Sequence, residues 1–230
     1  MSSIPRAERL IVALDVPTPK EARALAEKLG DSVRFYKIGL ELFTAEGYFE
    51  LLAWLTGRGN KVFADLKLYD IPETVRRAVA NLRSTGATFL TVHAHRSVME
   101  AAAREKGGMK ILAVTVLTSF DQRDLEGLGT VEQVVLARAK GAVETGCDGV
   151  ISSGLEAKVL KKEFKDRLLV VTPGIRPKAA GDDQKRTVDV AQAFANGADY
   201  IVVGRPVRDA PDPREAAEAI QATISTVFKT

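Results

Sequence analysis

The chain has 230 residues, of which 46% are hydrophobic and 27% charged, and its 33 basic and 30 acidic residues leave a net charge of only +3. This composition is typical of a soluble globular protein with enough apolar material for one sizeable core. Because the charge is mixed, without a long basic run or basic residues interleaved with aromatic ones, a nucleic-acid-binding protein is not expected.

The cysteine content and the lengths of the apolar runs indicate the cellular compartment of the protein. Its one cysteine, Cys147, excludes an internal disulfide and is compatible with a reducing compartment. Residues 1–10 lack the basic-then-apolar order of a signal peptide. No apolar run approaches the ~18–20 residues that a membrane span needs. We therefore expect a cytoplasmic protein that does not bind a membrane.

Short apolar runs alternate with amphipathic segments along the chain. The run 10–15 predicts a strand. Thr18, with Glu21 three residues later, predicts a capping box at the start of a helix over 20–29, and Gly30 ends that helix. The same alternation predicts further strands at 32–38, 61–67, 86–93, 110–117, 148–151, 168–171 and 199–203. It predicts further helices at 40–55, 70–84, 97–105, 131–144, 155–164, about 186–195 and 212–228.

A short sequence motif recurs at three of these strands. Gly86, Gly146 and Gly197 each end a helix and are followed by a polar step and a β-branched or aromatic run. The repetition indicates one βα unit used many times. Near-continuous apolar strands alternating with helices imply a parallel sheet covered on both faces. Eight units in 230 residues favour a single-domain (β/α)8 barrel, the TIM barrel, over an open sheet.

The strand over 61–67 carries the most unusual group of charges. Asp65 and Lys67 are two residues apart, so their side chains should emerge on the same face where an apolar strand ends. Asp70 follows at the start of the next helix, where it is a candidate N-cap, with Pro72 in the first turn and Glu73 completing a capping box. A buried structural ion pair is the alternative interpretation of Asp65 and Lys67, but charge at this position favours a functional site.

Other polar residues fall at strand ends, where the active sites of such barrels lie. Lys37 shares a strand face with Val33 and Phe35 and should point inward, unless it snorkels to the surface. Asp15 is either a site residue or an acid that caps the following turn. The full set of candidates on this rim is Asp15, Lys37, Asp65, Lys67, His93, Thr118, Gly204 and Arg205.

Three residues, His93 of the rim among them, are interpreted as structural. His93 and His95 have no carboxylate or cysteine spacing that would make a metal site. Cys147 lies at a helix end with no basic neighbour or paired histidine that would activate it.

A phosphate site is predicted at the ends of the last two strands. The chain contains neither a P-loop nor a dinucleotide-binding fingerprint. In barrels, phosphate is commonly held after strands seven and eight. Gly174 and Gly204 permit close approach of the backbone, Arg176 and Arg205 supply cationic donors, and Gln184 a neutral one. The loop 175–185 is expected to close over the ligand, whereas the simpler alternative is that Gly204 and Arg205 only turn the chain.

Taken together, these motifs resemble one enzyme family along almost the whole chain. The run Asp65-Leu-Lys67-x-x-Asp70-Ile-Pro-x-Thr74 is followed in order by Thr172-Pro-Gly-Ile-Arg176, Asp183-Gln184 and Val203-Gly-Arg205. This combination resembles bacterial orotidine 5'-phosphate decarboxylases. The resemblance implies a homodimeric (β/α)8 barrel that converts orotidine 5'-phosphate to UMP and CO2 in pyrimidine synthesis. It implies no metal and no organic cofactor.

The resemblance also implies roles for individual residues. Lys37 and Asp65 would join Lys67 in a charged network, in which Lys67 stabilises and protonates the carbanion at C6. Asp70 would reach into the partner subunit's site. The residues expected to contact other parts of the nucleotide are Asp15 and Thr74 near the ribose, Thr118 at the pyrimidine, and Arg176, Gln184, Gly204 and Arg205 at the phosphate.

The chain departs mildly from the family pattern. Leu68-Tyr69 stands in place of Phe-His, Glu73 in place of a common Asn, and His95-Arg96 in place of small residues.

Two rival functions fit parts of the sequence. A sugar-phosphate decarboxylase such as 3-keto-L-gulonate 6-phosphate decarboxylase shares the Asp-x-Lys-x-x-Asp run but uses Mg2+. A metal site would favour a carboxylate at the position of Lys37. A non-catalytic sensor of phosphate ligands would keep Arg205 and Gln184 but would not need Asp65 beside Lys67.

Overall fold

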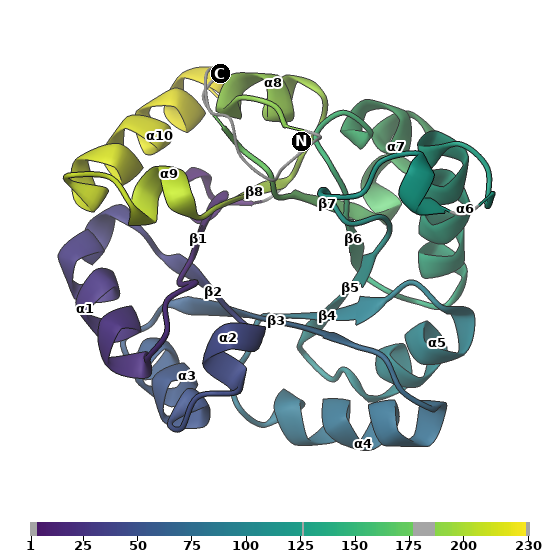
Figure 1. The fold of residues 1–230 in the computed structure, drawn as a ribbon, viewed down its shortest axis with the longest axis horizontal. Coiled ribbons are helices and arrows are strands. Elements are labelled where there is room, and N and C mark those ends of the chain that lie inside the picture. Colours follow the sequence, from purple (N-terminus) through teal and green to yellow (C-terminus); the bar gives the residue numbers. More distant parts are fainter. Residues whose placement is uncertain (1–3, 126, 177–186, 229–230) are drawn as a thin grey trace.

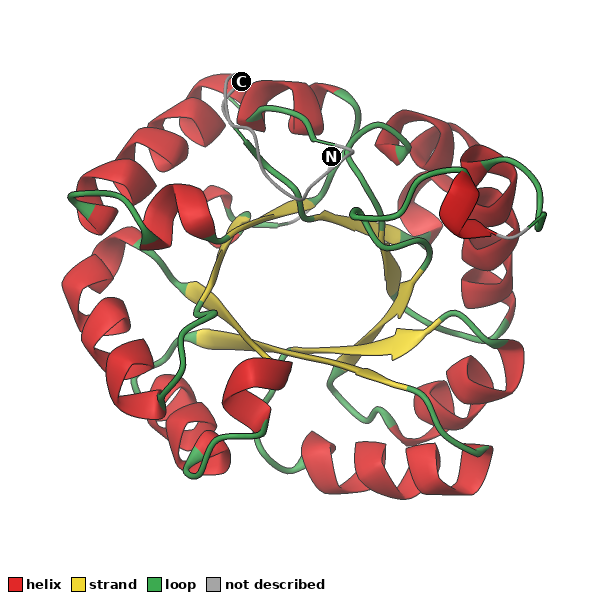
Figure 2. Ribbon diagram, viewed as in Figure 1, coloured by secondary structure: helices red, strands yellow, loops and turns green. Residues whose placement is uncertain are grey.

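The computed structural model describes residues 4–125, 127–176 and 187–228. In this part of the chain, eight parallel strands pair in sequence order, and β8 pairs back onto β1, so the sheet is a closed barrel. Helices surround the ring of strands (Figures 1 and 2). The predicted (β/α)8 architecture is confirmed. The strands are β1 (Leu10–Ala13), β2 (Phe35–Gly39), β3 (Lys61–Leu68), β4 (Phe89–His93), β5 (Lys110–Val114), β6 (Gly149–Ile151), β7 (Leu169–Thr172) and β8 (Tyr200–Val203).

The helices follow the strands around the outside. They are α1 (Pro19–Leu29), α2 (Leu40–Phe43), α3 (Tyr48–Gly57), α4 (Pro72–Arg83), α5 (Arg96–Glu105), α6 (Val131–Glu144), α7 (Ala157–Phe164), α8 (Val190–Ala195), α9 (Arg205–Arg208) and α10 (Pro213–Val227). Short 3-10 helices lie at Arg6–Glu8, Gly30–Ser32, Arg123–Leu125 and Lys165–Arg167. None of the described helices has the length and apolar character needed to span a bilayer.

Local turn chemistry agrees with several sequence predictions. Thr18 caps α1, since its hydroxyl oxygen accepts a hydrogen bond from the Glu21 backbone N–H at 3.2 Å. The Glu21 carboxylate accepts from the Thr18 hydroxyl, so the reciprocal half of the predicted capping box does not form. Gly86, Gly146 and Gly197 all have left-handed φ angles, of 82°, 81° and 100°, as expected of glycines that end helices.

The single helix predicted over 40–55 is wrong. The structure divides it into α2 and α3, and Gly47, at a φ of 93°, lies immediately before α3. That left-handed conformation cannot continue a helix, and glycine adopts it at the lowest cost. The apolar periodicity runs across the break, which explains why it predicted one helix. Helix α9, after Gly204, was not expected from the sequence at all.

The predicted capping box at the start of α4 is also wrong. Ile71 is the N-cap residue, and no side chain caps the helix there. Asp70 instead accepts a hydrogen bond from the adjacent Ile71 backbone N–H at 2.6 Å. The Glu73 carboxylate turns away from the helix start and pairs with Arg76 and Arg77.

The buried side chains form two layers. An outer layer fills the space between strands and helices, and an inner one fills the barrel. Four rings pack edge-on or tilted inside the barrel, with centroids 5.0 to 5.9 Å apart: Phe35, Phe63, Phe89 and Tyr200. Val33 belongs to the outer layer, so its predicted shared face with Phe35 and Lys37 is wrong, because β2 begins only at Phe35.

A polar layer lies directly above these rings. Two residues after Phe35, Phe63 and Phe89 come Lys37, Asp65 and Thr91, and side chains two apart on a strand share a face. The aromatic rings therefore form the floor of the barrel interior beneath the polar side chains.

Candidate active site

Four charged side chains of alternating sign lie in a row at the ends of β1, β2 and β3. Lys37 Nζ is 2.7 Å from Asp15 Oδ1 and 3.5 Å from Asp65 Oδ2, and Lys67 Nζ is 2.9 Å from the same Asp65 oxygen. We call Asp15, Lys37, Asp65 and Lys67 the charged cluster. The predicted adjacency of Asp65 and Lys67 is confirmed. Snorkelling of Lys37 is excluded, because that residue is only 9% exposed.

Burial and charge act in opposite directions on the middle pair of the cluster. Burial by itself would lower the pKa of Lys37, but Asp65 and Asp15 outweigh it and raise that pKa. Burial would raise the pKa of Asp65, but Lys37 and Lys67, with hydrogen bonds from Lys67 and Thr91, hold it below its ordinary value. Both residues are therefore charged at neutral pH, and neither charge is left uncompensated.

The backbone of Lys67 departs from regular strand geometry. Its φ angle is +47°, and the register between β3 and β4 shifts between Ala64 and Leu68. A non-glycine residue in this region is strained, and such positions concentrate at functional sites. The Lys67 backbone N–H donates to the Thr91 hydroxyl oxygen at 3.0 Å instead of to a strand carbonyl.

A cavity of about 270 Å³ opens above the charged cluster. All four cluster residues line it, together with Thr118 and Ser119 from the segment after β5. Its apolar lining includes Phe63, Ile151 and Val202 of the barrel interior. A planar ring would thus have apolar walls on one part of its surface and two ammonium groups on another.

The predicted phosphate residues line an adjoining cavity of about 160 Å³. Gly174, Arg176, Gly204 and Arg205 all contribute to it, and Gly174 has a left-handed φ of 75°. The two cavities share Asp15, Lys37, Thr118, Pro173 and Val202 as lining residues, so they adjoin each other. Gln184 and most of the predicted closing loop lie outside the described residues. Hollows of about 330, 430 and 490 Å³ elsewhere on the described part of the chain are larger, but none of the charged cluster lines them.

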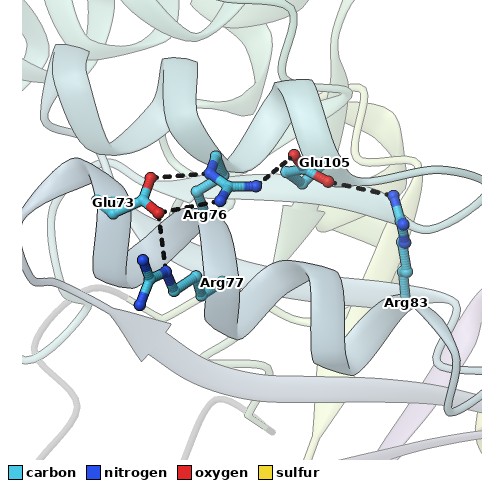
Figure 3. A network of polar contacts seen from close by, with 5 residues as sticks. All are labelled: Glu73, Arg76, Arg77, Arg83 and Glu105. Carbon is cyan, nitrogen blue, oxygen red and sulfur yellow. Dashed lines mark hydrogen bonds and ion pairs between the residues drawn. The ribbon is translucent and has the colours of Figure 1, made fainter.

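Asp70 and Thr74 do not join the site of their own chain. Both are exposed, and neither is among the described residues that line the two cavities. Asp70 precedes α4 and Thr74 lies in its first turn. Ion pairs join α4 to α5 (Figure 3). Arg76 pairs with Glu73 of its own helix and, at 2.9 Å, with Glu105 of α5, and Glu105 also pairs with Arg83. This network links α4, the helix that follows Asp70 and contains Thr74, to α5.

The histidines and the cysteine are not arranged as metal ligands. Among the described residues, no group of three His, Cys, Asp or Glu side chains is placed to hold a metal ion. The ring of Tyr69 lies 5.4 Å from that of His93 and 6.0 Å from that of His95. Burial, Lys67 and Arg138 lower the pKa of His93. Cys147 is buried, and burial raises the pKa of its thiol to about 11, as expected of an unreactive structural cysteine.

Three residues at the site were missed from the sequence. Thr91 lies two positions after Phe89 in a buried strand. Because side chains two apart share a strand face, this spacing could have predicted a polar group inside the barrel. Gly39 leaves room for the cluster, since a Cβ there would lie 3.1 Å from Lys37 Nζ. Arg208, one turn after Arg205, lines the phosphate cavity and donates to the Asp15 carbonyl oxygen.

Comparisons with known proteins show which family the chain resembles. A model described as "Orotidine 5'-phosphate decarboxylase / HUMPS family" matches residues 8–220. Orotidine 5'-phosphate decarboxylase from Methylococcus capsulatus is 58% identical, over 98% of this chain and 95% of the relative. The enzyme of that name from Xanthomonas campestris is 50% identical, over 94% and 92%. The crystal structure of the Lactobacillus acidophilus decarboxylase superposes with a TM-score of 0.83 at 37% identity, covering 94% of this chain and 99% of that one.

Proposed function

The chain belongs to the orotidine 5'-phosphate decarboxylase / HUMPS family, and we propose that its charged cluster carries out the decarboxylation. The enzyme is a carbon–carbon lyase of pyrimidine biosynthesis that converts orotidine 5'-phosphate to UMP and CO2. The observation that carries the proposed site is the alternation of charge along Asp15, Lys37, Asp65 and Lys67, with Lys37 and Asp65 buried, beneath a partly apolar cavity.

Lys67 is proposed as the residue that acts at the reacting carbon. Loss of CO2 from C6 leaves a vinyl carbanion with no adjacent carbonyl to delocalise it. A fixed ammonium group close to C6 stabilises the developing charge and then donates a proton to the carbon. The position of the Lys67 ammonium, 2.9 Å from Asp65 and lining the cavity, supports both roles.

Asp65 is proposed to hold Lys67 in place and to lie near the substrate carboxylate, where like charges repel. Two unit charges 4 Å apart are worth about 4 kcal/mol at an effective dielectric constant of about 20. Enzymatic rate accelerations require ~8–23 kcal/mol. A single pair therefore cannot supply the acceleration, and binding energy from elsewhere in the substrate must contribute.

The phosphate cavity is the proposed source of that energy. Arg176 and Arg205 supply guanidinium donors, and Gly174 and Gly204 give the phosphate access to the backbone. Thr118 lines both cavities and is proposed to meet the pyrimidine, while Asp15 is proposed to meet the ribose. Because the two cavities adjoin, one nucleotide can occupy both.

A homodimer with shared sites is also proposed. Large apolar side chains are exposed in the segments that follow β2 and β3: Leu40, Phe43, Phe49, Tyr69 and Ile71, each between 43% and 66% exposed. Soluble monomers rarely leave such a group uncovered, so a second subunit is expected here. Asp70 and Thr74 lie at the same edge and would then enter the partner's site.

We further propose that the chain is a single barrel domain, that the reaction needs no metal ion and that it takes place in the cytoplasm. Lys37 supports a metal-independent reaction, since a lysine stands where a divalent ion would favour a carboxylate. The test is to follow the absorbance loss of orotidine 5'-phosphate with purified protein, with and without EDTA. Equal turnover in both is expected. Absent turnover, or turnover abolished by EDTA and restored by Mg2+, would contradict the proposal.

A further inference from the structure

Thr91 belongs to the polar layer inside the barrel. It lies on β4 and is fully buried, with an exposed fraction of 0%. Two residues earlier on the same strand, Phe89 packs in the aromatic floor. A hydroxyl at this depth requires hydrogen-bond partners, because burial of an unpaired polar group is unfavourable.

The hydrogen bonds of Thr91 have only one consistent direction. Its Oγ1 accepts from the Lys67 backbone N–H at 3.0 Å and lies 2.8 Å from Asp65 Oδ1. An ionised carboxylate accepts only, and a hydroxyl has a single proton to donate. The Thr91 proton is therefore committed to Asp65, and one side chain connects the backbone of Lys67 with the carboxylate of Asp65.

These two hydrogen bonds restrain the Asp65 carboxylate and the Lys67 backbone. Asp65 Oδ2 meets both lysine ammonium groups, while Oδ1 receives the Thr91 proton. The carboxylate is thereby fixed in rotation with Oδ2 toward the lysines. Lys67 has the strained φ of +47°, and its N–H is held by the same hydroxyl. Loss of that hydroxyl would free both the carboxylate plane and the backbone from which the Lys67 side chain extends.

We propose that Thr91 is a positioning residue for decarboxylation, whose hydroxyl sets the placement of Lys67 and Asp65 relative to each other. This inference rests on the proposed function of the charged cluster. Thr91 itself is not among the residues that line the nucleotide cavities, in the part of the chain that the structure describes. Loss of its hydroxyl should therefore lower the rate of the chemical step and leave the affinity for the nucleotide unchanged.

The test compares Thr91→Val, which keeps the shape but lacks the hydroxyl, with Thr91→Ser, which keeps the hydroxyl. We expect kcat of T91V to fall roughly 100-fold, the scale of loss when reacting groups are misplaced by about 1 Å. KM, and the Kd for UMP measured by calorimetry, should stay within about threefold of wild type, because both depend on contacts that Thr91 does not make. T91S should recover most of kcat.

The outcomes separate this inference from the function on which it rests. Wild-type protein without turnover would contradict the function. Active wild type with T91V of similar kcat would contradict the role of Thr91 alone, as would T91S no better than T91V. A parallel loss of UMP affinity in T91V would show a general structural role instead. If T91V does not fold, Thr91→Ala, which also lacks the hydroxyl, takes its place with the same expected results.

Discussion

Lys67 Nζ lies 2.9 Å from Oδ2 of Asp65, two residues earlier on the same strand, although the Lys67 backbone is left-handed. Adjacent positions of one strand face would place these side chains side by side, but the bulge between Ala64 and Leu68 adjusts where the lysine emerges. The ammonium thus reaches the cavity while it keeps its carboxylate partner. The predictions below test what this arrangement does.

Replacement of Lys67 should affect chemistry, and replacement of Arg205 should affect binding. Lys67→Ala removes both the stabilising charge and the proton donor, so we expect kcat to fall on the order of 10⁴-fold or more. Arg205→Ala should mainly raise KM, because it removes a phosphate contact remote from C6. Lys110→Ala, an exposed lysine at the start of β5, is the control and should match wild type. Steady-state kinetics measure both parameters, and small, equal effects of the first two changes would contradict the separate roles of Lys67 and Arg205.

Mixing of inactive subunits tests whether Asp70 acts across a dimer. Asp70→Ala and Lys67→Ala subunits should each be inactive alone. In a two-fold dimer, their hybrid contains one site with both intact residues, so random mixing should restore about a quarter of wild-type activity. The control is a mixture of Arg205→Ala with Lys67→Ala, assayed at low substrate concentration. Because both residues line the cavities of their own chain, every site of the hybrid carries one change, and activity above the average of the two parents is not expected. Absence of recovery with Asp70→Ala would place Asp70 outside the partner's site.

The exposed apolar group should be the dimer interface. Ile71 is 66% exposed, and Ile71→Asp would introduce a charge there, so we expect the protein to become monomeric and to lose activity together with the dimer. Val227→Asp, a change at a 38%-exposed apolar residue of α10, should leave both unchanged. Sedimentation at several concentrations distinguishes the states. A fully dimeric Ile71→Asp protein would exclude this surface as the interface.

The pKa of His93 should depend on the positive charge of Lys67. Burial, Lys67 and Arg138 lower the pKa of His93, since each disfavours the imidazolium form. Removal of one positive charge in Lys67→Met should raise that pKa toward its ordinary value. Titration of the imidazole Cε1 protons by NMR can follow this, because the chain contains only two histidines. An unchanged His93 pKa in Lys67→Met would mean that the lysine charge does not reach the ring.

The sequence predicted the elements and many site positions because these depend on short-range interactions. Alternating apolar runs and helix-ending glycines such as Gly146 act within a few residues, so they predicted a closed set of eight βα units. The predictions of local structure were wrong where the same sequence pattern is compatible with two different structures. Apolar spacing continued across Gly47, and Asp70 and Glu73 had the right spacing for a cap but formed other contacts.

Contacts between distant segments of the chain depended on how the barrel closes. Thr91 meets Asp65 across 26 positions of sequence, and the Arg208 side chain reaches the carbonyl of Asp15 across 193. Such pairs follow from strand register, the bulge near Lys67 and the tilt of a closed sheet, none of which is encoded within a single strand. Residue types therefore indicated which groups could take part in catalysis, whereas packing of distant strands set which groups touch and in which direction each proton points.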